Sequence, residues 1–167
     1  SGLAYGIDIT AHKAALRTGL PTAGVLAHGL STIYPSAHRQ IAADMVHGGG
    51  MLITEYPHDA PVHRGNFLAR NRIIAALADC TIVVESAEKG GALVTAGIAQ
   101  SYDRDVFALP GRTSDPYSKG CNRLIAGNGA ALIQNADDLM TAMGWMQEKS
   151  VQGIQKEIFT VYTEKEQ

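Results

Sequence analysis

The sequence predicts an α/β fold, with one domain built on a mainly parallel sheet and helices on both of its faces. Short, continuously apolar runs alternate with helix-like stretches, and each predicted strand is followed by a helix. Strands that are apolar along their whole length are typical of parallel sheets, because both faces of such sheets are buried. The composition agrees with a globular domain, since 46% of the 167 residues are hydrophobic and only 18% are charged.

The elements are assigned in chain order from these runs. Strands are short and bounded by Gly, Pro or polar residues, whereas the longer stretches between them suit helices. The predicted strands cover residues 22–27, 51–54, 81–86, 105–110 and 130–133. The predicted helices lie near residues 8–18, 37–47, 67–78, 92–102, 119–127 and 136–144.

The chain begins with a glycine-rich turn, "SGLAYGID", in which Asp8 is expected to cap a helix at residues 11–16. Such turns normally follow a strand, and none precedes this one in the sequence. We therefore expect that a first strand of the sheet is missing. Asp8 and His12, four residues apart on the predicted helix, are expected to form a local hydrogen-bonded pair.

The last segment, residues 146–167, mixes charged residues and glutamine with a short apolar set at Ile154, Ile158 and Phe159. We interpret it as a tail or linker, so the domain is expected to span residues 1–145. An apolar stripe of this kind is expected to contact a partner surface.

Several function classes lack support in the composition. The two cysteines, Cys80 and Cys121, have no zinc-binding spacing, and Cys80 in a predicted strand is interpreted as a small buried side chain. No apolar stretch is long enough to span a bilayer, and a reducing, cytoplasmic location is expected. The net charge of −2 means that a polyanionic partner would require a local basic patch.

Ligands of open parallel sheets bind beyond the carboxyl ends of the strands. The loops expected there are rich in Gly, Pro and small polar residues, and they cover residues 1–7, 28–36, 55–66, 86–92 and 110–120. Gly90 and Gly91 open the helix at 92–102, where backbone N–H groups can bind a phosphate. No acid, base or metal ligand follows them, which predicts a loop that holds a phosphate and does not catalyse.

Basic residues are expected along the same edge. Asn71 and Arg72 fall in the first turn of a predicted helix, where the helix dipole favours anions. The predicted basic strip consists of Arg39, Arg64, Arg70, Arg72, Arg112 and Lys119. A strip of this kind on an otherwise neutral protein is typical of a protein that binds a phosphate backbone.

Two carboxylates, Glu55 and Glu85, each end a predicted strand at this edge. They could form an acid/base pair, or each could accept backbone N–H groups or an arginine and hold the loops in register. The sequence contains no G-x-S-x-G motif, no H-E-x-x-H motif and no evident nucleophile with a histidine partner.

Six motifs occur in order: "SGLAYGID", "GLSTIYPSAHRQI", "NFLARNRIIAALAD", "IVVESAEKGGALVTAGIA", "DVFALPG" and "GCNRLIAGNGAALI". Together they resemble the DNA-processing protein A family, also called Smf, over roughly residues 1–144. The resemblance implies a Rossmann-like bacterial domain that binds single-stranded DNA and loads the RecA recombinase onto it, in natural transformation and recombination. It also implies a homodimer. From the loop, motif and composition arguments above, we expect no enzymatic activity, no cofactor or metal, and no membrane partner.

The resemblance implies DNA-contacting roles for matching positions of this chain: Gly2, Arg39, Asn71, Arg72, Gly91, Thr95 and Gly111. Gly90 and Arg112 join this set from the loop and charge arguments. Family members often have lysine where this chain has Arg39, and Ser-Gly-Ser where it has Gly-Gly-Ala at 90–92. They also carry a strand with a "GTR"-like motif before "SGLA", and many carry a C-terminal winged helix beyond the region matched here.

The alternative is an enzyme. A related Rossmann-like family, the "lonely guy" phosphoribohydrolases that act on nucleoside monophosphates, also uses a Gly-Gly loop before a helix, and that helix supplies a catalytic glutamate. Here Ala96, Gly97 and Ile98 follow Thr95, so hydrolysis would have to recruit Glu55 or Glu85. A nicotinamide-dependent dehydrogenase is less well supported, because no G-x-G-x-x-G motif opens a βαβ unit. A purely structural role would leave the basic edge unexplained.

Overall fold

The computed structural model describes residues 1–145, which belong to two compact units. The first unit, Ser1–Leu132, contains the five described strands and helices α1 to α5. The second begins at Ile133, and its described part holds α6 (Ala136–Ala142), which is capped by the Asn135 side chain accepting from the backbone N–H of Asp138. The predicted tail at 146–167 lies outside the described residues.

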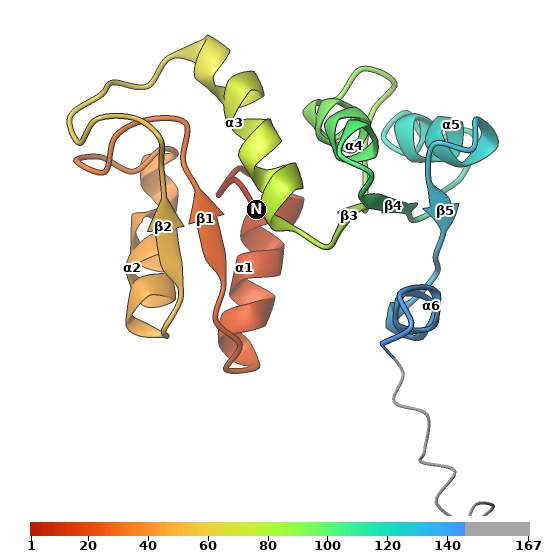
Figure 1. The fold of residues 1–167 in the computed structure, drawn as a ribbon, viewed down its shortest axis with the longest axis horizontal. Helices are drawn as coiled ribbons and strands as arrows, with labels where there is room; N and C mark the ends of the chain where they lie inside the picture. Colours follow the sequence, from red (N-terminus) through yellow and green to blue (C-terminus); the bar gives the residue numbers. More distant parts are fainter. Residues whose placement is uncertain (146–167) are drawn as a thin grey trace, which may run out of the picture. The chain divides into compact units, whose positions relative to one another are not determined.

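Strands and helices alternate as the sequence predicts (Figure 1). The strands of the first unit are β1 (Ala23–Val25), β2 (Met51–Ile53), β3 (Cys80–Val83), β4 (Asp105–Ala108) and β5 (Ala131–Leu132). Its helices are α1 (Ile7–Arg17), α2 (Arg39–His47, after a 3-10 turn at Ser36–His38), α3 (Arg64–Leu77), α4 (Gly91–Ser101) and α5 (Lys119–Ala126). Every strand pair is parallel, which confirms the predicted fold class.

The strands form two sheets, whereas the sequence predicted one. β1 pairs with β2, and β4 lies between β3 and β5. No pairing joins β1 to β3 in the described residues, so each of these strands ends its own sheet (Figure 1). Parallel strands are normally central in a sheet covered by helices, and an unpaired edge here is therefore unusual.

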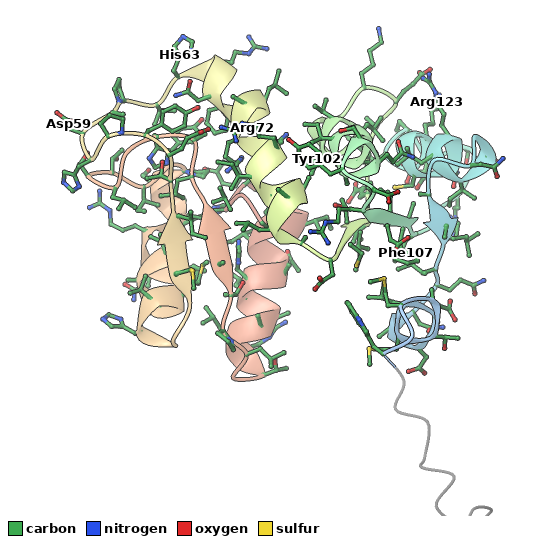
Figure 2. All side chains as sticks on the ribbon, viewed as in Figure 1. Asp59, His63, Arg72, Tyr102, Phe107 and Arg123 are labelled. Carbon is green, nitrogen blue, oxygen red and sulfur yellow. The ribbon has the colours of Figure 1, made fainter. Side chains whose placement is uncertain are left out.

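Two apolar cores hold the first unit together. One core surrounds β1 and is formed by Leu3, Ile9, Leu26, Ala42 and Met45. The other lies around β3 and β4, and it uses small side chains where α3 packs on α4: Ala75, Ala96 and Ala99 are each fully buried. The lack of large side chains at these positions lets the two helices approach closely. Figure 2 shows the side chains on this framework, including the buried Phe107 on β4.

The loops at the carboxyl ends of neighbouring strands contact each other. The backbone N–H of Gly29, after β1, donates to the Ala60 carbonyl after β2 (2.9 Å). The N–H of Ser86, after β3, donates to the Tyr117 carbonyl after β4 (2.8 Å). Leu68 of α3 and Gly91 of α4 line the same two cavities, so the loops leading into these helices share one edge, as predicted.

The predictions for Asp8 and His12 are wrong. Asp8 lies inside α1, and its carboxylate accepts hydrogen bonds from the backbone N–H groups of Gly2 (2.9 Å) and Ala4 (3.3 Å), so it braces the preceding loop and does not cap the helix. His12 is buried and pairs through Nδ1 with the Thr22 hydroxyl (2.7 Å). Burial lowers the pKa of His12 to about 4, which keeps the ring neutral.

Candidate nucleic-acid interface

The glycine loop at the start of α4 is open in the way that anion binding requires. Gly90 is the N-cap residue in an extended conformation, and no side chain caps the helix. A Cβ added at Gly91 would meet nothing within 4 Å, whereas one at Gly90 would lie 2.3 Å from the Ser86 hydroxyl. Gly90 therefore allows the loop to close against Ser86, and Gly91 leaves the helix N-terminus accessible.

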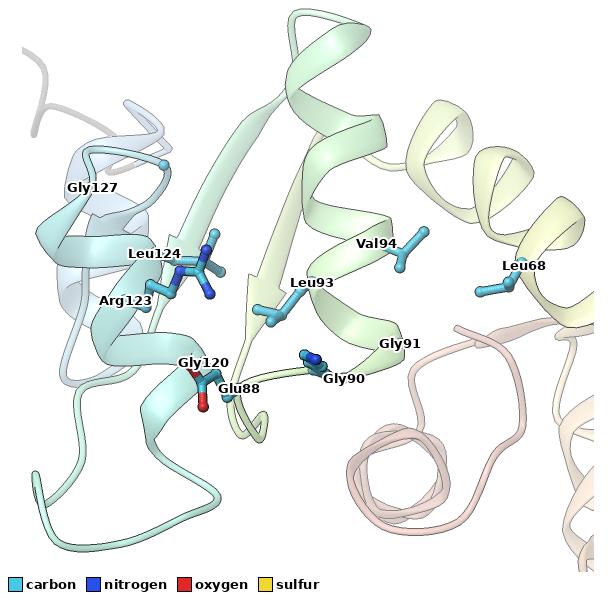
Figure 3. A pocket seen from close by; sticks show the side chains of 12 residues that line it. Leu68, Glu88, Gly90, Gly91, Leu93, Val94, Gly120, Arg123, Leu124 and Gly127 are labelled. Carbon is cyan, nitrogen blue, oxygen red and sulfur yellow. The ribbon is translucent and has the colours of Figure 1, made fainter.

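A cavity of about 660 Å³ lies beside this loop, between α4 and α5 (Figure 3). Gly90, Gly91 and Leu93 form one side of it, and α5 contributes Arg123. Lys89 also lines the cavity, and the side chains of Lys89 and Arg123 are both exposed. The cavity therefore combines an uncapped helix N-terminus with two cations, with Glu88 as the acidic side chain in its lining.

Lys89 and Arg123 were not among the site residues that the sequence predicted. Lys89 follows the strand β3 within the same loop as the two glycines, and Arg123 lies within the sixth motif on α5. Their positions in the sequence could have identified them, because each belongs to a strand–loop–helix unit whose loop was predicted to lie at the ligand-binding edge.

A second cavity, of about 610 Å³, brings together three of the predicted site residues. Asn71 of α3 and Gly91 and Thr95 of α4 all line it. Asn71 is buried, and its side-chain oxygen accepts from Nε of Arg70 (3.3 Å). The Thr95 hydroxyl is 3.4 Å from the Gly91 carbonyl one turn earlier, so this contact is long.

Arg70 does not belong to the basic strip, although the sequence placed it there. It is only 5% exposed, and its guanidinium donates to the carbonyls of Gly2 (3.0 Å) and Val25. Burial lowers the pKa of Arg70 from its usual value. The residue is thus an internal clamp between α3, the first loop and the end of β1.

Gly2 is explained by this clamp. A Cβ at Gly2 would lie 2.6–2.7 Å from the guanidinium atoms of Arg70, closer than any side chain can approach. The close contact that Gly2 permits is therefore to the protein's own arginine. DNA contact by Gly2 stays a prediction.

Arg72 lies two residues further along α3 and has the opposite environment. Its side chain is 51% exposed and pairs with Glu55, whose side chain is 33% exposed. This is the ion pair found within residues 1–145. Glu55 thus accepts from an arginine, which was the non-catalytic of the two roles expected for it. Exposed pairs of this kind contribute little stability, so Arg72 can exchange its carboxylate for another anion at small cost.

Two other predicted basic residues, Arg39 and Arg112, do not line either cavity. Arg39 is exposed at the first position of α2. Arg112 is exposed in the loop after β4. Its neighbour Gly111 is held by Asn122 of α5, which accepts from the Gly111 N–H (3.1 Å) and donates to its carbonyl (3.0 Å).

Within the described residues, the structure shows few groups suited to act as a nucleophile or to bind a metal ion. Burial raises the pKa of both thiols, Cys80 and Cys121, which keeps them protonated near neutral pH. Within residues 1–145, no three His, Cys, Asp or Glu side chains are grouped closely enough to hold a metal ion. None of the helices in this range has the length and apolar character that a bilayer crossing requires.

Comparisons with known proteins all point to one family of DNA-processing proteins. The profile of the family described as DNA recombination-mediator protein A matches residues 1–144. Protein Smf of Escherichia coli is 45% identical over 140 residues, which are 84% of this chain and 37% of that protein. DNA processing protein DprA of Streptococcus pneumoniae is 41% identical over 141 residues, covering 84% of this chain and 49% of that protein. The chain therefore spans half or less of the length of these curated relatives.

Two solved structures share the fold. The X-ray structure of DNA processing protein A from Streptococcus pneumoniae superposes with a TM-score of 0.76 at 38% identity, covering 84% of this chain and 49% of the other. DNA processing protein A from Helicobacter pylori, whose structure addresses its single-stranded DNA binding mode, superposes with a TM-score of 0.75 at 32% identity. The match covers 85% of this chain and 63% of the other.

Proposed function

Because the chain belongs to the DNA recombination-mediator protein A family, we propose that it binds single-stranded DNA through the phosphate backbone and passes the strand to the RecA recombinase. The observation that carries this proposal is the start of α4, where an uncapped helix N-terminus opens into a cavity rimmed by Lys89 and Arg123. The relative from Helicobacter pylori, which binds single-stranded DNA, supports the same ligand class.

The arrangement favours binding over catalysis. Glu55, one of the two carboxylates that hydrolysis could recruit, is paired with Arg72. Inside α4, the positions after Thr95 are Ala96, Gly97 and Ile98, and Ala96 is fully buried, so this helix presents no acid to a ligand at its N-terminus. A phosphoribohydrolase would place its general acid or base there. We therefore propose that the protein holds DNA without cleaving it.

We propose that two exposed aromatic side chains elsewhere in the first unit stack on bases of the bound strand. Tyr34 is 49% exposed and lies edge-on to Phe67 of α3, with ring centroids 5.7 Å apart. Tyr5 is 68% exposed beside the ring of His38. Single-stranded nucleic acids combine phosphate contacts with stacking of bases on rings of this kind, without requiring a particular sequence.

The function is tested by titrating labelled oligonucleotide, single-stranded against duplex, at two salt concentrations. Arg39→Ala and Arg72→Ala are each expected to weaken single-strand binding to a similar degree for different sequences. Each should reduce the slope of log affinity against log salt by about 0.7, the value for one phosphate contact on a single strand. Arg104→Ala is the matched control, because Arg104 is exposed and immediately precedes β4, at the amino end of the strands.

An unchanged affinity in folded Arg39→Ala and Arg72→Ala, or an equal loss in Arg104→Ala, would exclude the carboxyl edge as the DNA site. Hydrolysis of a nucleoside monophosphate by the unmodified chain would instead favour the phosphoribohydrolase.

We also propose that the protein acts as a homodimer and that residues 146–167, which lie outside the described range, contribute to association. The basis is the apolar set at Ile154, Ile158 and Phe159. A chain ending at Trp145 is expected to keep its circular dichroism spectrum and to shift toward monomer in sedimentation. An unchanged oligomeric state would assign this segment to a linker.

A further inference from the structure

His28 is a buried polar residue at the base of the loop that follows β1, and the DNA-binding site described above does not include it. The residue is only 1% exposed, and the Thr54 hydroxyl donates to its carbonyl (2.7 Å). Ring atom Nδ1 lies 2.8 Å from the carbonyl oxygen of Gly29, and Nε2 lies 3.3 Å from the backbone nitrogen of Tyr34. The imidazole therefore connects the start of this loop to its far end, six positions later.

These two contacts determine the protonation state that the ring must have. A carbonyl oxygen can only accept a hydrogen bond, so Nδ1 has to carry the proton. A backbone N–H can only donate, so Nε2 has to be unprotonated. Both bonds form together only in the neutral ring that is protonated at Nδ1. A second proton on Nε2 would face the N–H of Tyr34 and break that bond.

The two ends of the loop are held differently. At its start, the backbone N–H of Ser31 donates to the carbonyl of His58, on the loop after β2 (2.8 Å). For residues 32–34 within the described range, the bond from Tyr34 to His28 is the backbone hydrogen bond that the structure shows. Loss of the acceptor at Nε2 would therefore loosen the far end of the loop while its start stays in place.

The segment that His28 holds carries two groups that we propose to contact DNA. The Tyr34 ring is 49% exposed, and its centroid lies 5.7 Å from that of the Phe67 ring. Arg39 follows at the first position of α2, directly after the 3-10 turn. A base stacks more favourably on a ring whose backbone is already ordered, because less conformational entropy is lost on binding.

We propose that His28 is a positioning residue for single-stranded DNA binding. Its neutral ring fixes the backbone at Tyr34, which orders the tyrosine ring for stacking on a base, and protonation of the imidazole releases this segment. The proposal rests on the proposed function, since it concerns how one part of the DNA-binding surface is held in place.

The charge state of the ring is set without an ion pair. The segments hydrogen-bonded to residues 25–31 and the loop itself carry these titratable or charged side chains: Tyr34, Glu55, Tyr56, His58, Asp59, Arg64 and Arg70. Within residues 1–145, none of them forms an ion pair with His28. The two hydrogen bonds of the ring therefore identify the form that the fold requires.

Two substitutions of His28 separate the roles of its ring nitrogens. In His28→Gln, the side-chain carbonyl oxygen can replace Nε2 as the acceptor for the Tyr34 N–H, and it does not titrate near neutral pH. In His28→Asn, the shorter side chain can keep the contact to Gly29 but does not extend to Tyr34. Both variants and the unmodified protein are compared by urea denaturation, by amide hydrogen exchange and by oligonucleotide titration at about pH 8 and about pH 5, the range in which histidine changes its charge.

At the higher pH, His28→Asn is expected to bind single-stranded DNA at least about threefold more weakly, as part of the stacking contribution of one base is lost. Its Tyr34 amide should exchange at least about tenfold faster, because local opening becomes less costly. His28→Gln should match the unmodified protein in both measurements and should depend less on pH. In a Tyr34→Ala background, His28→Asn should have little further effect on affinity.

The unmodified protein provides a test that needs no substitution. Protection of the Tyr34 amide should fall between the higher and the lower pH, whereas the Ser31 amide, whose acceptor is a carbonyl, should keep its protection. Equal changes at both amides would overturn the proposal.

The variants can contradict it as well. Equal losses in His28→Asn and His28→Gln would indicate a purely structural role, and additive losses with Tyr34→Ala would show that the histidine does not act through the tyrosine. Failure of the unmodified protein to bind single-stranded DNA would instead contradict the proposed function.

Discussion

Gly91→Val is expected to weaken single-stranded DNA binding by about tenfold or more, equal to at least about 1.4 kcal/mol, with little change in stability. A Cβ added at Gly91 would meet none of the surrounding side chains or loops within 4 Å, so little loss of stability is expected. It would instead occupy the space in front of the first turn of α4, where the backbone must approach a phosphate. This loss should exceed that of Arg39→Ala or Arg72→Ala, since removing one charge leaves the site open.

Gly97→Val is the matched control for this variant. Gly97 lies on the same helix, and a Cβ there also meets nothing within 4 Å, but it is well past the first turn. The control should bind DNA as the unmodified protein does. If Gly91→Val and Gly97→Val bind equally tightly in a fluorescence anisotropy titration, the glycine loop is only a turn and the DNA contacts lie elsewhere.

Arg70→Ala is expected to lower the free energy of unfolding by about 3 kcal/mol, because charged hydrogen bonds to buried carbonyls are lost without replacement. The carbonyls of Gly2 and Val25 would lose the guanidinium that connects them, and a space would remain next to Asn71. Arg72→Ala, two residues away on α3, should lower it by less than about 1 kcal/mol, since its partner Glu55 is partly exposed.

Urea denaturation of both variants, combined with the oligonucleotide titration, separates the two roles. Arg72→Ala should bind the oligonucleotide more weakly and nearly keep its free energy of unfolding. Arg70→Ala should show the larger loss of unfolding free energy. Equal unfolding free energies for the two variants would show that the buried clamp contributes no more than a surface ion pair.

Much of the fold could be predicted because its signals are local. An apolar run followed by a helix-like stretch reports on a few consecutive residues, and the order of strands and helices follows from such runs. The same holds for Gly90 and Gly91, which mark the start of α4 in the sequence as they do in the structure. Lys89 and Arg123 were harder to find, since they meet at one cavity through the packing of α4 beside α5.

The sequence by itself determined the α/β class, the parallel pairing and the loops at the carboxyl ends of the strands, because these depend on short apolar runs and turn residues. Only the tertiary structure decided which of two arginines on one helix is buried. Arg70 reaches Gly2, 68 positions away, while Arg72 faces Glu55 at the surface. Tertiary structure also divided the strands into two sheets and left β3 with an open edge. The physical reason is that burial and strand pairing are set by contacts between segments far apart in the chain, which local patterns do not encode.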